Sequence, residues 1–194
     1  MCLKIGKIWV RCVVPSHSGA QSAVVLVRGL LLLAVLLSGG MPASADPYDD
    51  CAQRRDLDLS IRACTEIIER DGREASNRLS VAYKDRGDSY FAHGDYERAI
   101  SDFGRAINLS PEDADAYIKR GIAYDANGHY QHGIADFSMA INLRPGSPTP
   151  YTMRGGAYEL AGDKERAITD FEKALEIDRN LPTVREVLQR LKSK

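Results

Sequence analysis

Three pentapeptides organise this sequence: Tyr83-Lys84-Asp85-Arg86-Gly87, Tyr117-Ile118-Lys119-Arg120-Gly121 and Tyr151-Thr152-Met153-Arg154-Gly155. Each begins 34 residues after the one before it, and no insertion or deletion disturbs this register. Four further positions recur at the same interval: Tyr90, Tyr124 and Tyr158; Gly94, Gly128 and Gly162; Phe103, Phe137 and Phe171; Ala106, Ala140 and Ala174. A fixed period of this length indicates stacked structural repeats, which we assign to residues 80–113, 114–147 and 148–181.

Each repeat has the pattern of two helices joined by a turn. In the second repeat, Tyr117, Gly121 and Tyr124 are spaced as one face of a helix, and an apolar run over residues 134–141 has the same period. Gly128 separates the two runs. No strand pattern is present, so the sequence predicts an all-α fold.

Local signals refine these helices. Ser110-Pro111 and Ser147-Pro148 resemble N-caps with proline at the first helical position, so the next repeats are predicted to start there. A glycine recurs within each first helix, where it costs about 1 kcal/mol relative to alanine. Small residues stand opposite on the second helices, which predicts a close approach of the two helices. The two sets are Gly87, Gly121 and Gly155, and Ala99, Gly133 and Ala167.

The repeat length and recurring residues resemble the tetratricopeptide repeat, a helix–turn–helix unit of 34 residues. The resemblance covers residues 80–181 and implies a helical solenoid. The sequence departs from the family pattern at Arg86, Arg120 and Arg154, where leucine is usual. Because an aspartate recurs in each second helix, we interpret these arginines as partners in ion pairs within each repeat rather than as binding residues. The aspartates are Asp102, Asp136 and Asp170.

Stacked repeats need protected ends. At the C-terminal end, the apolar spacing within residues 182–194 predicts an amphipathic capping helix. At the other end, residues 46–79 resemble a partial repeat. This segment contains Cys51 and Cys64, which are predicted to form a disulfide; closing a loop of this size stabilises a fold by about 3 kcal/mol. The alternative is a pair of buried free thiols.

The first 45 residues have the pattern of a secretory signal peptide. They contain basic but no acidic residues, an apolar run over residues 29–37, and an Ala43-Ser44-Ala45 motif. Cleavage is predicted between Ala45 and Asp46. An uncleaved membrane anchor is the alternative, although nine apolar residues cover only roughly half of a bilayer core. The leader and the remaining cysteine pair together predict export, and the Ala-x-Ala motif favours a bacterial periplasm.

Composition and motifs exclude several function classes. The chain has 194 residues, 26 basic and 27 acidic, and this balance argues against a nucleic-acid partner. No phosphate loop or nucleophile motif is present, so neither an enzyme, a cofactor nor a small-molecule substrate is predicted. His129 and His132 stand three residues apart and could in principle hold a metal. Because no carboxylate or cysteine accompanies them at ligand spacing, we interpret them as solvated turn residues.

The resemblance implies a concave groove lined by the first helix of each repeat, which in this family accepts an extended peptide or a partner helix. The residues predicted to line it are Lys84, Asp88, Phe91, Ile118, Ile122, Asp125, Thr152, Gly156 and Glu159. A clamp for a partner's C-terminal carboxylate is not expected, since only Lys84 matches that pattern. Ile118 and Ile122 would form an apolar centre where affinity concentrates; alternatively, they pack against a neighbouring helix.

These observations predict a non-catalytic adaptor or scaffold with a protein or peptide partner. Two alternatives stay open. One is a structural homo-oligomer that assembles through the repeat ends. The other is an envelope component that its uncleaved leader tethers to the membrane.

Overall fold

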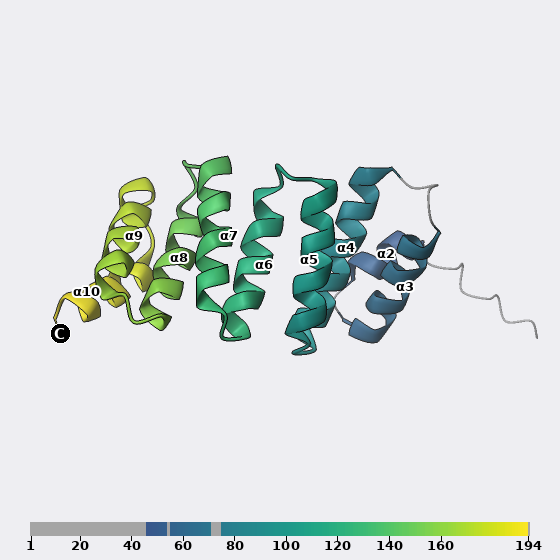
Figure 1. Cartoon of the computed structure of the whole chain (residues 1–194), viewed down its shortest axis with the longest axis horizontal. Coiled ribbons are helices and arrows are strands. Elements are labelled where there is room, and N and C mark those ends of the chain that lie inside the picture. The colour runs from purple at the N-terminus through teal and green to yellow at the C-terminus, as the bar shows by residue number, and fades with distance from the viewer. Residues whose placement is uncertain (1–45, 54, 71–74, 194) are drawn as a thin grey trace, which may run out of the picture. The chain divides into compact units, whose positions relative to one another are not determined.

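The computed structural model of this chain describes residues 46–53, 55–70 and 75–193. These ranges contain nine helices and no strand (Figure 1). The predicted leader, with its cleavage site after Ala45, lies outside the described residues. Within them, none of the helices has the length and the apolar character that crossing a membrane requires.

Six of the helices form the three predicted repeats, which confirms the all-α solenoid. Each first helix leads into its second through a turn in which glycine has a φ of 79–83°, a conformation that favours glycine over other residues. The first helix of the first repeat begins at Ser76, four residues before the predicted boundary. The helix pairs are α4 (Ser76–Ala92) and α5 (Tyr96–Leu109), α6 (Ala114–Ala126) and α7 (Tyr130–Leu143), and α8 (Pro148–Leu160) and α9 (Lys164–Ile177).

One predicted N-cap is correct and the other is wrong. Ser147 precedes Pro148 at the start of α8 as expected. Ser110 and Pro111 instead lie in the turn before α6, and the N-cap is Asp113, whose side chain accepts a hydrogen bond from the backbone N–H of Asp115. The carboxylate of Asp113 is a stronger cap at this point because it satisfies a free helical donor and carries the charge that a helix N-terminus favours.

The recurring glycines are explained by the phenylalanines rather than by the opposing small residues alone. A Cβ on Gly87, Gly121 or Gly155 would lie 2.7, 2.6 or 2.9 Å from the ring of the phenylalanine in the second helix of the same repeat. Phe103, Phe137 and Phe171 are almost completely buried. The expected close approach of small residues does occur in the second repeat, where a Cβ on Gly133 would lie 3.0 Å from the Gly121 carbonyl oxygen.

The predicted ion pairs form in every repeat and are confirmed as structural. Each arginine donates two hydrogen bonds of 2.7–2.8 Å to the two carboxylate oxygens of its aspartate: Arg86 to Asp102, Arg120 to Asp136, and Arg154 to Asp170. The aspartates are only 4–5% exposed. These hydrogen bonds raise the pKa of each arginine above its ordinary value. The arginines therefore stay charged and tie the two helices of a repeat together.

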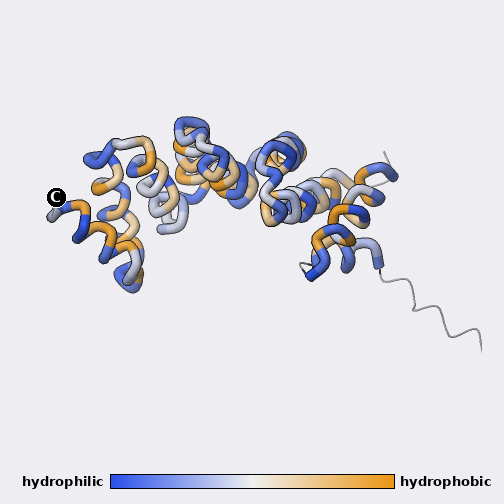
Figure 2. Tube along the Cα trace, turned by 90° about the horizontal axis from the view of Figure 1, so that it is seen from below, coloured by the Kyte–Doolittle hydropathy of each residue, from blue (hydrophilic) through white to orange (hydrophobic). Residues whose placement is uncertain are grey.

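The predicted capping helix is present as α10 (Pro182–Lys192). Its residues Val184, Leu188 and Leu191 are buried with Phe171 and other residues of α9. In Figure 2 its hydrophobic residues lie on one side and its hydrophilic residues on the other. This helix therefore covers the apolar face that the third repeat would otherwise expose.

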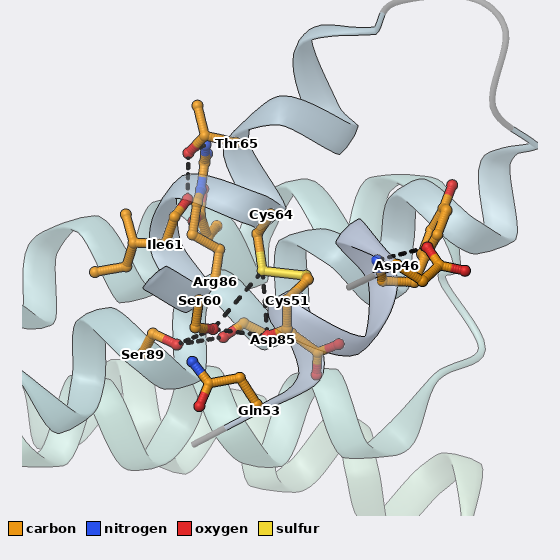
Figure 3. Close-up of a disulfide and its surroundings, with 12 residues drawn as sticks. Asp46, Cys51, Gln53, Ser60, Ile61, Cys64, Thr65, Asp85, Arg86 and Ser89 are labelled. Atoms are coloured by element: carbon orange, nitrogen blue, oxygen red, sulfur yellow. Dashed lines mark hydrogen bonds and ion pairs between the residues drawn. A yellow bond between two sulfur atoms is a disulfide. The ribbon is translucent and has the colours of Figure 1, made fainter. Parts of the chain in front are cut away.

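At the N-terminal end, α2 (Pro47–Ala52) pairs with α3 (Leu57–Glu69), and α3 packs on α4. Cys51 and Cys64 form the predicted disulfide, with Cα atoms 4.7 Å apart (Figure 3). The Ser60 hydroxyl donates to the Cys51 carbonyl oxygen at 2.6 Å and lies 2.8 Å from the Ser89 hydroxyl of α4. The disulfide and this buried polar network join the partial repeat to the first full one.

Candidate functional site

The residues predicted to line the groove lie on the first helices, α4, α6 and α8. These helices pack on one another directly from repeat to repeat as well as on their own second helices. No comparable packing joins α5, α7 and α9 to each other within the described residues. The first helices therefore stand closer together than the second ones, as expected if they line the inner side of the solenoid.

In the first repeat, the predicted polar groove residues form ion pairs with α6 and its N-cap. Lys84 donates to the Asp113 carboxylate at 2.5 Å, and Lys119 donates to both carboxylate oxygens of Asp88 at 2.7 Å. Burial opposes the ionisation of Asp113, but the hydrogen bond and the charge of Lys84 outweigh it and lower its pKa. These side chains therefore fix the spacing between α4 and α6. Phe91 lies beside them, 5.4 Å from the ring of Tyr96.

The middle of the groove is apolar. Ile118 and Ile122 are half-buried and pack, together with Met153, against the buried cluster of Ile134, Phe137 and Ala157. The two isoleucines thus contact neighbouring helices, as the alternative interpretation proposed, and still keep part of their surface exposed. Met153 was not among the residues predicted to line the groove, so sequence reasoning missed it.

Asp125 is an unusual carboxyl in this region. Its Oδ1 atom is buried and has no hydrogen-bond partner among the described residues. The carboxylate fits because the nearby residue of α7 is Gly133, on which a Cβ would lie 2.2 Å from that oxygen. Burial raises the pKa of Asp125 to about 7. This carboxyl therefore lies against α7, and its charge changes near neutral pH.

The third repeat leaves the groove open. A Cβ on Gly156 would meet no atom within 4 Å. Thr152 is occupied by its own helix, since its hydroxyl donates to the Pro148 carbonyl oxygen at 3.1 Å. Glu159 pairs with Arg190 of α10 at 2.8 Å. The predicted groove residues thus separate into charged pairs near both ends, with an apolar and accessible stretch between them.

A pocket of about 240 Å³ lies at the N-terminal end of this surface. One wall comes from the α2–α3 segment and the other from α4, with Lys119 of α6 at the edge. The cysteine pair predicted that the N-terminal segment is tied to the solenoid, but nothing in the sequence predicted that it borders the groove. The residues that line the pocket are Cys51, Ala52, Gln53, Leu57, Asp85, Asp88, Ser89, Phe91, Ala92 and Lys119.

Among the described residues, no group of three or more histidine, cysteine, aspartate or glutamate side chains is arranged to hold a metal ion. What the arrangement offers is a shaped surface with an apolar centre and charged margins.

Comparison with known proteins identifies the repeats. A model of the TPR repeat matches residues 87–128, and a model of the tetratricopeptide repeat matches residues 148–181. The chain therefore contains tetratricopeptide repeats. No curated protein matches its sequence significantly.

Solved structures, tetratricopeptide repeat domains among them, share the fold. The second TPR domain of human RPAP3, in complex with the HSP70 peptide SGPTIEEVD, is 28% identical with a TM-score of 0.59, over 61% of this chain and 99% of that one. The first TPR of Spaghetti (RPAP3), bound to the HSP90 peptide SRMEEVD, is 23% identical with a TM-score of 0.59, over 63% and 97%. MamA is 27% identical with a TM-score of 0.51, over 64% and 90%.

Proposed function

We propose that this protein is a non-catalytic adaptor that binds a peptide or a helix of a partner protein in the groove of α4, α6 and α8. The observation that carries this proposal is the half-exposed apolar centre of Ile118, Ile122 and Met153 beside the open position Gly156. The RPAP3 domain that is 28% identical has a peptide bound, which supports the same use of the fold here. Apolar burial in a preformed groove would supply most of the affinity.

The ion pairs on these helices argue against a partner that binds through its C-terminal carboxylate. Lys84, the single residue that matches such a clamp, already pairs with Asp113, and Asp88 pairs with Lys119. A partner carboxylate would have to compete with these intramolecular pairs. An internal segment with apolar side chains fits the groove better than a free C-terminus.

Two glycines allow a clean test of the groove. Gly156 lies in the groove and Gly146 in the turn before α8, and a Cβ on either would meet nothing within 4 Å. Gly156→Arg and Gly146→Arg therefore add the same side chain without disturbing the core. Peptides selected from a random display library on the wild-type protein are expected to bind Gly146→Arg equally well and Gly156→Arg weakly or not at all. Equal binding to both variants, or NMR shifts confined to α5, α7 and α9, would refute the groove.

We also propose that the protein is exported, as the leader pattern of residues 1–45 and the disulfide suggest. The mass of the protein from its native host tests this directly. A mass equal to that of residues 46–194 supports export with cleavage. A mass that includes the leader, in a membrane fraction, would favour the tethered alternative.

A homo-oligomer through the C-terminal end is less well supported by the packing. The apolar face of α10 is already buried on α9 of the same chain. A second chain would have to displace this contact before it could use the same face.

A further inference from the structure

The turn between the two helices is built in the same way in the first and third repeats. Asp95 and Asp163 are the N-caps of α5 and α9, and each accepts a hydrogen bond from the backbone N–H three residues later, at 3.1 and 3.0 Å. The same aspartates pair with the side chains of Arg98 and Arg166. Those guanidinium groups lie over the rings of Tyr90 and Tyr158, at 4.4 and 4.5 Å from the centroids.

The second repeat has two histidines at these positions. His129 is the N-cap of α7 but makes no side-chain capping hydrogen bond. The ring of His132 stacks on Tyr124 at a centroid distance of 5.0 Å, in the place that an arginine takes in the other repeats. The two imidazole centroids are 5.9 Å apart with their planes at 72°, and both histidines are exposed. The repeat thus keeps the tyrosine and exchanges an ion pair for two adjacent imidazoles.

This separation is close to that of two histidines on one metal ion. With metal–nitrogen distances of about 2.0–2.1 Å and a tetrahedral angle, the ring centroids of two ligating imidazoles lie about 5.2 Å apart. The observed centroid spacing exceeds this value by about 0.7 Å, and both histidines are exposed. The nearly perpendicular planes place the two rings edge to face rather than stacked.

Against the sequence-based interpretation of these two histidines as solvated turn residues, we infer that His129 and His132 form a two-histidine site for a divalent transition-metal ion at the N-terminus of α7. Imidazole suits copper, nickel and zinc, and copper(II) binds such donors most tightly of the three. No third histidine, cysteine or carboxylate joins the pair among the described residues, so water or a donor from a partner would complete the coordination. The site is separate from the apolar centre of the groove, so its test does not depend on the adaptor proposal.

The other repeats supply the variant that tests this site. His129→Asp/His132→Arg installs the residues that α5 and α9 already use, so it is expected to fold and to gain the missing cap. His93→Asn, which installs the residue that the second repeat has at the equivalent position, is the matched control. Untagged full-length protein is titrated with copper(II) and zinc(II), by calorimetry and by electron paramagnetic resonance of the copper form.

The wild-type protein and His93→Asn are expected to bind one copper ion per chain, with a spectrum that shows two imidazole nitrogens. The double variant is expected to lose this binding and keep its helical circular dichroism. A reverse variant, Asp163→His/Arg166→His, is expected to gain a second equivalent of copper. Absence of imidazole-ligated copper in the wild-type protein, or equal binding by a folded double variant, would overturn the site.

Discussion

The N-terminal helix pair and the three full repeats use different contacts to hold their two helices together. In each full repeat, a buried phenylalanine ring fills the space that glycine leaves on the first helix, and an arginine–aspartate pair joins the two helices. In the α2–α3 pair, a disulfide links the short first helix to the second. A covalent bond thus replaces an aromatic contact where the first helix has only six residues.

Helix α3 nevertheless contacts the first helix of the next repeat in the way that the second helix of a full repeat does. Arg86 donates to the Thr65 hydroxyl of α3 at 2.9 Å, and Arg154 donates in the same way to the Ser138 hydroxyl of α7 at 2.9 Å. Stacking therefore requires that the second helix of each unit present a suitable surface to the next repeat. The contact between the two helices of one unit can differ from unit to unit. The predictions below test this distinction.

The largest effect is expected from the aromatic contact in the central repeat. Phe137 is fully buried and touches the glycine surface of α6. Phe137→Ala should lower the free energy of unfolding by about 3–5 kcal/mol, because it leaves a cavity that the ion pair holds open. Urea denaturation followed by circular dichroism measures this loss. A loss below about 1 kcal/mol would show that the aromatic contact is not what closes a full repeat.

The ion pair of Arg120 and Asp136 is expected to affect the free energy of unfolding mainly because its carboxylate is buried. Arg120→Leu installs the residue usual in this family but leaves Asp136 buried without its partner, and should cost about 3 kcal/mol. The double variant Arg120→Leu/Asp136→Ala removes the unpaired charge and should be the more stable of the two. If the single variant were as stable as the wild type, the pair would be dispensable for joining the helices.

The disulfide is expected to contribute up to about 3 kcal/mol, and mainly at one end of the chain. Cys51→Ser/Cys64→Ser should expose the amides of α2 and α3 to hydrogen exchange while those of α6 to α9 stay protected. The Thr65→Ala variant, in which the disulfide remains, separates the loss of the Arg86 contact from the loss of the covalent tie. Uniform loss of protection along the chain would mean that the N-terminal pair and the repeats unfold as one unit.

The repeats were predictable from the sequence because their period fixes the positions of the core residues. The 34-residue spacing of the recurring tyrosines, glycines, phenylalanines and alanines placed six helices, and the arginines and aspartates that recur at the same spacing predicted the ion pairs within the repeats. Helix α2 was not predictable, since six residues are too short for a periodic pattern and the disulfide supplies its stability. The cap at Asp113 was missed because serine followed by proline carries the same local signal as a true helix start.

The groove was predictable only as a set of positions. Helical spacing places Lys84, Asp88 and Ile118 on the first helices, but it does not say which side chains pair with each other. The contacts of Lys84 and Asp88 with α6 and its N-cap depend on how one repeat is rotated against the next. The burial of Asp125 likewise depends on the glycine of a different helix.

That buried carboxyl gives the smallest and most specific prediction. The pKa of Asp125 is raised from 3.8 to about 7, so the folded state holds its proton over a range where the unfolded state has lost it. Stability from this group is therefore present at pH 4 and is lost as the pH rises towards 7 and above. Asp125→Asn removes that loss and should stabilise the protein by about 1–2 kcal/mol at pH 8, allowing for partial contact with solvent, and by much less at pH 4.

The equivalent residue of the third repeat provides the control. Glu159 pairs with Arg190, so Glu159→Gln removes an ion pair and should give no gain at pH 8. Urea denaturation of the three proteins at pH 4 and pH 8 isolates the effect, because all other titrating groups are shared. A gain for Asp125→Asn that is equal at both pH values would mean that the side-chain amide finds a hydrogen bond there, and that no buried charge distinguishes the second repeat from its neighbours.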